Sequence, residues 1–120
     1  MIVDDAEDTV EMLRRLLESE GYNILTATNG EDALKLLRSK EETPDLIILD
    51  MFMPLMSGRE VCKRIRDDAS LKDIKIVFFT VAAFSELGKQ MLKDFNVLDY
   101  ITKPFDVDDF LKRIRKALDR

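Results

Sequence analysis

Apolar residues along this chain alternate between short continuous runs and longer stretches with helical spacing. The short runs predict five strands, at residues 1–3, 22–27, 46–49, 74–79 and 98–101. Between and after these runs, apolar residues recur every three or four positions, which predicts five amphipathic helices. The helical positions are Val10, Leu13, Leu16 and Leu17; Ala33, Leu34 and Leu37; Val61 and Ile65; Phe84, Leu87, Met91 and Phe95; and Val107, Phe110, Leu111, Ile114 and Leu118.

Glycine, asparagine and proline separate these elements. We expect Gly21 to end the first helix and Asn96 the fourth, because both residue types tolerate the left-handed conformation of a helix end. Asn29-Gly30 predicts a turn, and Pro54 with Gly58 predicts a loop before the third helix.

The regular alternation of strand and helix predicts a single α/β domain over residues 1–120, because parallel strands require helical crossovers. The runs at 46–49 and 74–79 are apolar throughout and should lie at the centre of a doubly wound, five-stranded parallel sheet. The flavodoxin-like strand order 2-1-3-4-5 places them there. A Rossmann-type second half would need a sixth strand, for which the chain has no room, and we expect no effector domain within these residues.

Polar residues follow four of the five predicted strands. Asp4 and Asp5 follow the first strand, Asp50 the third, Thr80 the fourth and Lys103 the fifth. The carboxyl ends of parallel strands share one edge of the sheet, and ligands bind there at the point where the strand order reverses. We therefore expect three carboxylates close together, with a hydroxyl and an ammonium beside them.

Three neighbouring carboxylates repel one another, by about 3 kcal/mol for two charges about 5 Å apart at an effective dielectric constant of about 20. A divalent cation would relieve this repulsion, and carboxylates, a backbone carbonyl and waters suit Mg²⁺. An aspartate in such a site is a plausible nucleophile toward phosphorus, with Lys103 and Mg²⁺ neutralising the transferred group and Thr80 donating a hydrogen bond. Singly, each residue could serve only as a helix cap, a turn residue or a solvated lysine. Their convergence at one sheet edge favours the chemical interpretation.

Composition narrows the functional classes. The chain has 120 residues, a net charge of −5 and no histidine. The negative charge argues against direct nucleic-acid binding through a basic face. The lack of histidine excludes Ser/His/Asp catalysis and histidine-ligated zinc. No apolar run is long enough to span a membrane, and the single cysteine, Cys62, suits a reducing compartment, so we predict a cytoplasmic protein without a membrane partner.

Four segments resemble the signature regions of response-regulator receiver domains: IVDD (2–5), LIILDMFMP (46–54), FFT (78–80) and DYITKPF (99–105). The resemblance implies a signalling switch in which Asp50 accepts a phosphoryl group from a histidine kinase or a histidine phosphotransfer protein. It further implies that Asp5 binds Mg²⁺ directly, Asp4 binds it through water, and the backbone carbonyl of Phe52 completes the protein ligands.

The same resemblance implies a route from phosphorylation to output. Thr80 and Lys103 would contact the phosphoryl group, and Tyr100 would turn inward as the Thr80 hydroxyl moves toward it. This movement would change the surface formed by the fourth helix, the fifth strand and the fifth helix. The family's bond before the proline that matches Pro104 is typically cis.

Some residues depart from the family pattern. The first strand is very short, which bears on stability, and Val81 replaces the usual alanine or glycine after the threonine. Phe52 is a bulky group at a position that tunes phosphoryl lifetime, and Asn96-Val97-Leu98 replaces the commoner Gly-Ala-Asp. A partial match to the dimer face of receivers joined to winged-helix transcription factors suggests dimerisation on phosphorylation; it comprises Lys89, Asp99, Asp109 and Arg113.

Two alternatives to the switch remain open. The first is a Mg²⁺-dependent phosphatase with an aspartyl nucleophile, although Phe52 occupies the position where haloacid-dehalogenase-like enzymes have a second aspartate. The second is a receiver-like module that binds partners without phosphorylation. A receiver would catalyse only its own phosphorylation and dephosphorylation, so we do not expect an enzyme with a separate substrate. The downstream target is left open.

Overall fold

The computed structural model of the chain describes residues 1–81 and 86–120. Five strands and five helices alternate along the described chain. They are β1 (Ile2–Val3), α1 (Glu7–Ser19), β2 (Thr26–Ala27), α2 (Gly30–Ser39), β3 (Leu46–Leu49), α3 (Gly58–Asp67), β4 (Lys75–Thr80), α4 (Glu86–Asp94), β5 (Asp99–Thr102) and α5 (Val107–Leu118). Phe84 and the side chain of Leu87, both expected on the fourth helix, lie outside the described part.

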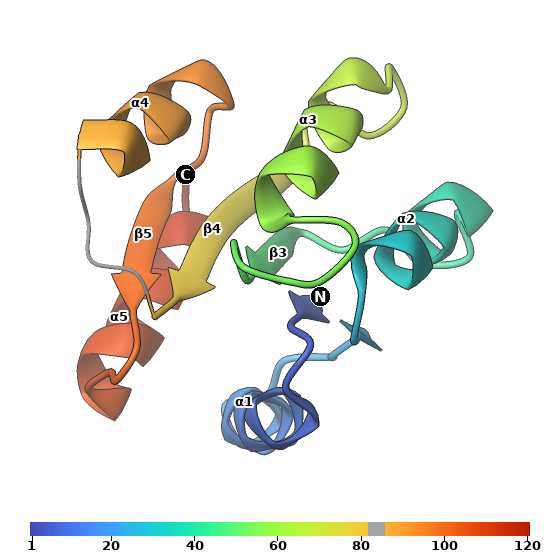
Figure 1. Cartoon of the computed structure of the whole chain (residues 1–120). Helices are drawn as coiled ribbons and strands as arrows, with labels where there is room; N and C mark the ends of the chain where they lie inside the picture. The colour runs from blue at the N-terminus through green and yellow to red at the C-terminus, as the bar shows by residue number, and fades with distance from the viewer. Residues whose placement is uncertain (82–85) are drawn as a thin grey trace.

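The five strands form one parallel sheet in the order β2-β1-β3-β4-β5, which confirms the predicted doubly wound α/β fold. Helices α2, α3 and α4 cover one face, and α1 and α5 cover the other (Figure 1). All four residues of β3 are buried. Ile47 and Leu49 pack into the core under α2 and α3, whereas Leu46 and Ile48 pack under α1 and α5. The apolar residue at every position of β3 follows from this arrangement, since successive side chains enter opposite layers.

The ends of the helices follow local sequence signals. Gly21 has a φ of 93°, and the N–H groups of Gly21 and Tyr22 donate to the carbonyls of Glu18 and Leu17, which forms the expected glycine end of α1. Asn96, with a φ of 53°, plays the same part after α4. The predicted turn at Asn29-Gly30 is wrong. Asn29 is the N-cap of α2, its side chain accepts a hydrogen bond from the Asp32 N–H at 2.8 Å, and Gly30 is already helical.

The predicted strand at residues 22–27 is also too long, because only Thr26–Ala27 pairs as β2. The neighbouring strand β1 has only two residues with which β2 can pair. The Tyr22 N–H still donates to the Leu17 carbonyl at the end of α1. The strands predicted at 74–79 and 98–101 each lie one residue later, as β4 and β5. Cys62 is fully buried on α3. Within the described residues, no helix has the length and apolar composition that crossing a membrane requires.

The loop between β3 and α3 packs directly on the backbone that carries Asp50. A β-carbon at Gly58 would lie 2.1 Å from the carbonyl oxygen of Asp50, and the Gly58 N–H donates to the Met51 carbonyl at 2.9 Å. No side chain therefore fits at this position without moving the strand end that carries Asp50.

We expect Gly58→Ala to lower the free energy of unfolding by about 2–3 kcal/mol, because the added methyl group must displace backbone. Gly21→Ala is a matched control: a β-carbon there meets nothing within 4 Å. Its cost should be about 1 kcal/mol, from the left-handed backbone alone. Urea denaturation of both variants measures the difference. Equal losses would show that the loop does not press on Asp50 as described.

Candidate functional site

Strand register brings two carboxylates together at the reversal of strand order. Val3 of β1 pairs with Leu49 of β3, so the residues that follow them, Asp4 and Asp50, leave the sheet side by side. The Asp50 N–H donates to the Val3 carbonyl at 2.9 Å, which extends the ladder to the site. Asp5 follows on the same loop as Asp4. One carboxylate oxygen from each of the three aspartates lies within 4.8 Å of the others, as the sequence predicted.

The two inner carboxylates are withdrawn from water, and each is held by its own loop. Asp4 is 2% exposed and Asp50 is 6% exposed, whereas Asp5 is open to solvent. Asp4 accepts a hydrogen bond from the Ala6 N–H at 2.9 Å, and Asp50 accepts one from the Phe52 N–H at 3.2 Å. These backbone donors fix the carboxylates without removing the repulsion between them.

The pKa of Asp50 reflects this crowding. Burial raises the pKa above its ordinary value, and the charge of Asp4 raises it further. The Phe52 N–H, the Lys103 ammonium and the Thr80 hydroxyl act in the opposite direction, but they do not compensate fully. Burial and the charge of Asp4 therefore disfavour the ionised form of Asp50 in the folded chain and hold its pKa above the ordinary value.

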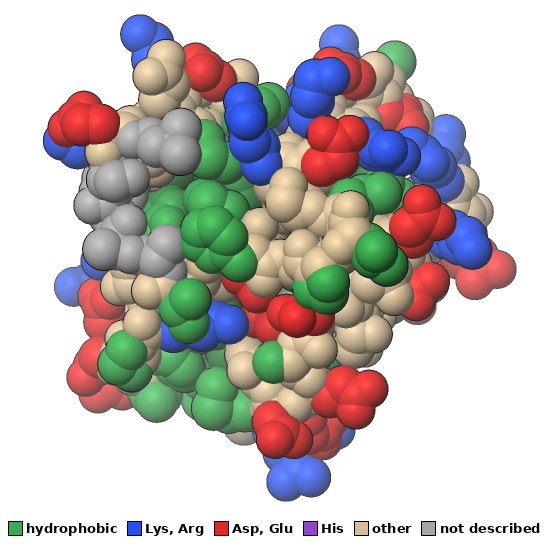
Figure 2. Space-filling model, viewed as in Figure 1, with side chains coloured by type: hydrophobic (Ala, Val, Ile, Leu, Met, Phe, Trp, Pro, Cys, Tyr) green, Lys and Arg blue, Asp and Glu red, His purple; other side chains and the backbone are tan. Residues whose placement is uncertain are grey.

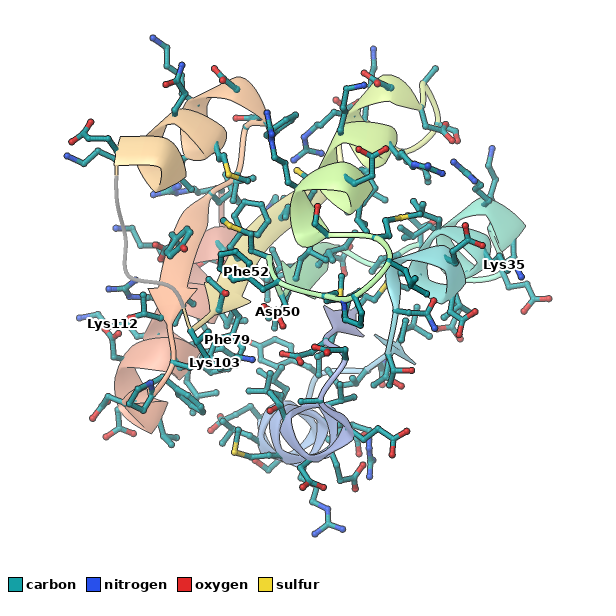
Figure 3. All side chains as sticks on the ribbon, in the orientation of Figure 1. Lys35, Asp50, Phe52, Phe79, Lys103 and Lys112 are labelled. Atoms are coloured by element: carbon teal, nitrogen blue, oxygen red, sulfur yellow. The ribbon has the colours of Figure 1, made fainter. Side chains whose placement is uncertain are left out.

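Lys103 follows β5, the edge strand of the sheet, and its side chain reaches the site from there. Its ammonium forms an ion pair with Asp4 at 2.7 Å rather than with Asp50, and its side chain is 18% exposed. Its backbone N–H donates to the Thr80 carbonyl at 2.8 Å, and the peptide bond to Pro104 is cis, as the resemblance implied. Figure 3 shows Lys103 and Phe79 lying beside each other near Asp50. The sequence predicted that the ammonium would reach the site, but not which carboxylate it contacts.

The Thr80 hydroxyl is fully buried at the end of β4 and makes no hydrogen bond within residues 1–81 and 86–120. It is near enough to Asp50 to lower the pKa of that carboxyl slightly, yet it does not reach hydrogen-bond geometry. Leaving a buried hydroxyl without a partner costs about 1–3 kcal/mol. Such a group is well placed to serve a ligand at this site.

Tyr100 lies inward on β5. Its ring is buried and meets the ring of Phe78 edge-on, with centroids 6.1 Å apart. Burial raises the pKa of its hydroxyl, and the charge of Asp50 adds to that effect. Tyr100 is therefore buried in this structure, and its part in switching stays a prediction.

Apolar side chains stand around the mouth of the site. Phe52 is 56% exposed and Val81 is 70% exposed, and both lie on loops beside Asp50. Figure 2 shows acidic and basic side chains together near the centre of this face, with hydrophobic side chains around them. The Val81 side chain is thus mostly exposed to solvent.

The four residues matched to a dimer face fall into two groups. Arg113 contacts Asp99 at 3.2 Å and Asp109 at 3.1 Å, so β5 and α5 are joined by ion pairs within the chain. Lys89 pairs with Glu86 on α4 at 3.2 Å. All of these pairs are at least partly exposed, so each contributes little stability by itself.

Sequence comparison gives the family. The family model of the response regulator receiver domain matches residues 1–115. The chain belongs to this family, whose members are signalling switches of two-component systems and take phosphoryl groups from histidine kinases or phosphotransfer proteins. The predicted resemblance is confirmed.

Two relatives match this chain over very different shares of their own length. The chain is 37% identical over 120 residues to the alkaline phosphatase synthesis transcriptional regulatory protein PhoP of Bacillus subtilis, covering 100% of this chain and 48% of PhoP. It is 37% identical over 119 residues to the polar-differentiation response regulator DivK of Brucella anthropi, covering 98% of this chain and 94% of DivK. The chain thus spans about half the length of one relative and nearly all of the other.

Solved structures agree with the fold. Chemotaxis protein CheY4 of Vibrio cholerae superposes with a TM-score of 0.87 at 31% identity, covering 97% of this chain and 94% of that one. Response regulator protein TrrA of Thermotoga maritima, solved in complex with Mg²⁺-BeF, gives a TM-score of 0.79 at 37% identity, covering 97% and 95%. Receiver domains bind Mg²⁺ at an acidic pocket, and the three aspartates of this chain form such a cluster.

The raised pKa of Asp50 gives a pH-dependent prediction. Because its pKa is raised on folding, the folded chain keeps this proton to a higher pH than the unfolded chain does, and stability falls as the pH rises through the raised pKa. Without divalent ions, Asp50→Asn should therefore be more stable than the wild type at neutral pH and should unfold at a higher temperature.

The gain should disappear below the ordinary pKa of 3.8, where Asp50 is protonated in both states. Asp5→Asn serves as a control, because that carboxylate is exposed and solvent screens it. Thermal melts of the three proteins across this pH range test the expectation. Equal stability of wild type and Asp50→Asn at neutral pH would contradict the repulsion described above.

Proposed function

We propose that this domain is a phosphorylation-activated switch that accepts a phosphoryl group on Asp50 from a histidine kinase or a histidine phosphotransfer protein. The observation that carries the proposal is the buried Thr80 hydroxyl, which has no partner among the described residues and lies near the Asp50 carboxylate. A phosphoryl group on Asp50 would supply the acceptor oxygens that Thr80 lacks. It would also give Lys103 a partner with more negative charge than Asp4.

The donor set fits a Mg²⁺ cofactor. Asp4, Asp5 and Asp50 offer hard oxygen ligands within 4.8 Å of one another, and the Phe52 carbonyl is the fourth ligand that the family resemblance implies. The exposure of Asp5 leaves room for the water molecules that Mg²⁺ retains. When bound, the ion would neutralise charge on the transferred group.

The residues of the chain have separate parts in the transfer. A carboxylate oxygen of Asp50 attacks phosphorus; the new P–O bond forms as the P–N bond of the donor's phosphohistidine breaks, and the imidazole nitrogen keeps the electron pair. Lys103 neutralises the oxygens of the transferred group, and the Thr80 hydroxyl donates to one of them. No separate substrate is required, so the domain catalyses only its own phosphorylation and dephosphorylation.

The output face would be the surface of α4, β5 and α5. A pocket of about 430 Å³ lies there, lined in part by Leu92, Tyr100 and Arg113. Thr80 and Tyr100 would couple the site to this face, because Thr80 senses the phosphoryl group and Tyr100 lines the pocket. The output partner is either a joined effector domain, as the length of PhoP suggests, or a separate protein, as the length of DivK suggests.

A cytoplasmic location is part of the same proposal and is supported by the single cysteine, which is a free buried thiol. Nucleic-acid binding by this domain itself is not part of the proposal, because the chain carries a net charge of −5.

Intact-mass spectrometry after incubation with Mg²⁺ and a small acyl-phosphate donor tests the switch chemistry. The wild type should gain one phosphoryl group, whereas Asp50→Asn should gain none, because it lacks the nucleophile. Chelation of Mg²⁺ should abolish the gain in the wild type.

Two further variants test the metal site in the same assay. Asp5→Asn should need about tenfold or more Mg²⁺ for the same phosphorylation, whereas Asp8→Asn, at another exposed aspartate three residues later, should behave as the wild type. A folded wild type that gains no phosphoryl group would replace the switch with a module that binds partners without phosphorylation. Steady turnover of small phosphate esters would favour the phosphatase.

Dimerisation on phosphorylation is a second part of the proposal. Arg113 is paired with Asp99 and Asp109 of its own chain, so a dimer on this face would have to exchange such pairs across the interface. Sedimentation with Mg²⁺ and beryllofluoride should then show a dimer that Arg113→Ala weakens by about tenfold. A monomer under these conditions would rule out this part and leave the switch chemistry intact.

A further inference from the structure

The Lys103 ammonium has a second partner besides Asp4, and it is an aromatic ring. Lys103 Nζ lies 5.0 Å from the ring centroid of Phe79, within the range of a cation–π interaction. Phe79 is the residue before Thr80 on β4, and its ring is buried. In Figure 3 the two labelled side chains meet beside Asp50. The ammonium is thus held between a carboxylate and the face of a ring.

The ring of Phe79 cannot move freely. It meets Phe105 with centroids 5.2 Å apart at 77° and Phe110 with centroids 5.4 Å apart at 58°, and the rings of Phe105 and Phe110 are themselves 5.1 Å apart. These three rings come from β4, from the loop after β5 and from α5. Each is packed against the other two, so the face that Phe79 turns to Lys103 is fixed by the core.

Two adjacent residues of β4 therefore hold Lys103 at both ends. The Thr80 carbonyl accepts the backbone N–H of Lys103 at 2.8 Å, and the Phe79 ring carries the ammonium. A free lysine side chain loses conformational entropy when it is fixed in one position. A site that already restrains the side chain avoids much of that loss when the phosphoryl group arrives.

The Asp4 ion pair alone would not keep the ammonium in place during transfer. Any cation that binds Asp4 competes with Lys103 for the same carboxylate, whereas the attraction of the ring does not depend on the charge of Asp4. The ring is therefore the partner that persists when Asp4 takes another ligand.

We propose that Phe79 is a positioning residue that holds the Lys103 ammonium ready for the phosphoryl group. The inference rests on the proposed function of Asp50 and Lys103 and adds a residue that acts only through Lys103. The alternative is that Phe79 only fills the core. The two differ in what happens when Lys103 is removed.

Phosphorylation by a small acyl-phosphate donor at saturating Mg²⁺ separates these possibilities. Phe79→Leu should slow phosphorylation about twofold to thirtyfold, the range expected for a lost cation–π interaction. Phe110→Leu is the matched control, because Phe110 is fully buried in the same cluster. It should destabilise the fold to a similar extent and leave the rate near that of the wild type. Equal slowing by both variants would overturn the inference.

A double-mutant cycle with Lys103→Gln gives the sharper test. If Phe79 acts through Lys103, then Phe79→Leu should have no further effect on the rate in the Lys103→Gln background. If the effects of the two substitutions multiply, Phe79 is core packing alone. Should Phe79→Leu fail to fold, ring fluorination at position 79 weakens the electron density of the ring at nearly constant volume. The rate should then fall with each added fluorine, and a constant rate would overturn the inference.

A spectroscopic readout separates failure of this inference from failure of the proposed function. The methylene protons of Lys103 should show upfield ring-current shifts in NMR spectra of the wild type, and these shifts should be lost in Phe79→Leu but kept in Phe110→Leu. Absence of the shifts in the wild type would overturn the positioning role whatever the activity. If the shifts are present but the wild type is not phosphorylated, both the proposed function and the positioning role fail, and the contact is structural only.

Discussion

The pairing of β1 with β3 holds the carboxylates of Asp4 and Asp50 so close together that their charges repel each other. Their backbones are held by ladder hydrogen bonds, 3.2 Å from the Asp4 N–H to Ala27 and 2.9 Å from the Asp50 N–H to Val3, so neither can retreat without unpairing a strand. Three other groups contact these two carboxylates. One loop N–H group donates to an oxygen of each carboxylate, and the Lys103 ammonium, from the loop after β5, pairs with Asp4. The site is unfavourable for the isolated chain, and an added cation would relieve the repulsion between the carboxylates.

The rest of the fold offsets this local cost. Two apolar layers pack on the faces of the sheet. Among the described residues, only the Thr80 hydroxyl is a buried side-chain polar group without a hydrogen-bond partner. The half-buried Arg66 on α3 is well satisfied: its guanidinium donates to the carbonyls of Ile74 at 2.7 Å and Phe95 at 2.6 Å, and also reaches Lys72 and Asn96. It thereby ties the ends of α3 and α4 to the entry of β4. Strain is concentrated at the carboxyl edge of the sheet, where ligands can use it.

The sequence predicts the sheet well because a short, continuous apolar run such as Leu46–Leu49 is typical of a strand buried on both faces. The convergence of Asp4, Asp5 and Asp50 follows from topology alone. The sequence does not predict which of several nearby groups a side chain contacts. Lys103 could pair with Asp4 or Asp50, and only side-chain geometry decides for Asp4. The positions of Phe79 and Arg66 are hidden for a similar reason, because an apolar residue in a buried strand and an arginine on a helix are ordinary features until their neighbours are known.

The pairing of β4 with β5 places Thr80 close to Tyr100 in the sheet. Phe78 pairs with Tyr100 and Thr80 pairs with Thr102 in the ladder, so the group that would sense phosphate lies two residues from the partner of Tyr100. Arg113 of α5 in turn donates to the Tyr100 carbonyl at 3.4 Å and to Asp99 at 3.2 Å. A displacement of Thr80 toward a phosphoryl group would therefore act on β5, a strand that contacts both α4 and α5. Because β4 is buried and closely packed, such a displacement is more readily accommodated by repacking of the outer strand and these two helices than by compression of the core.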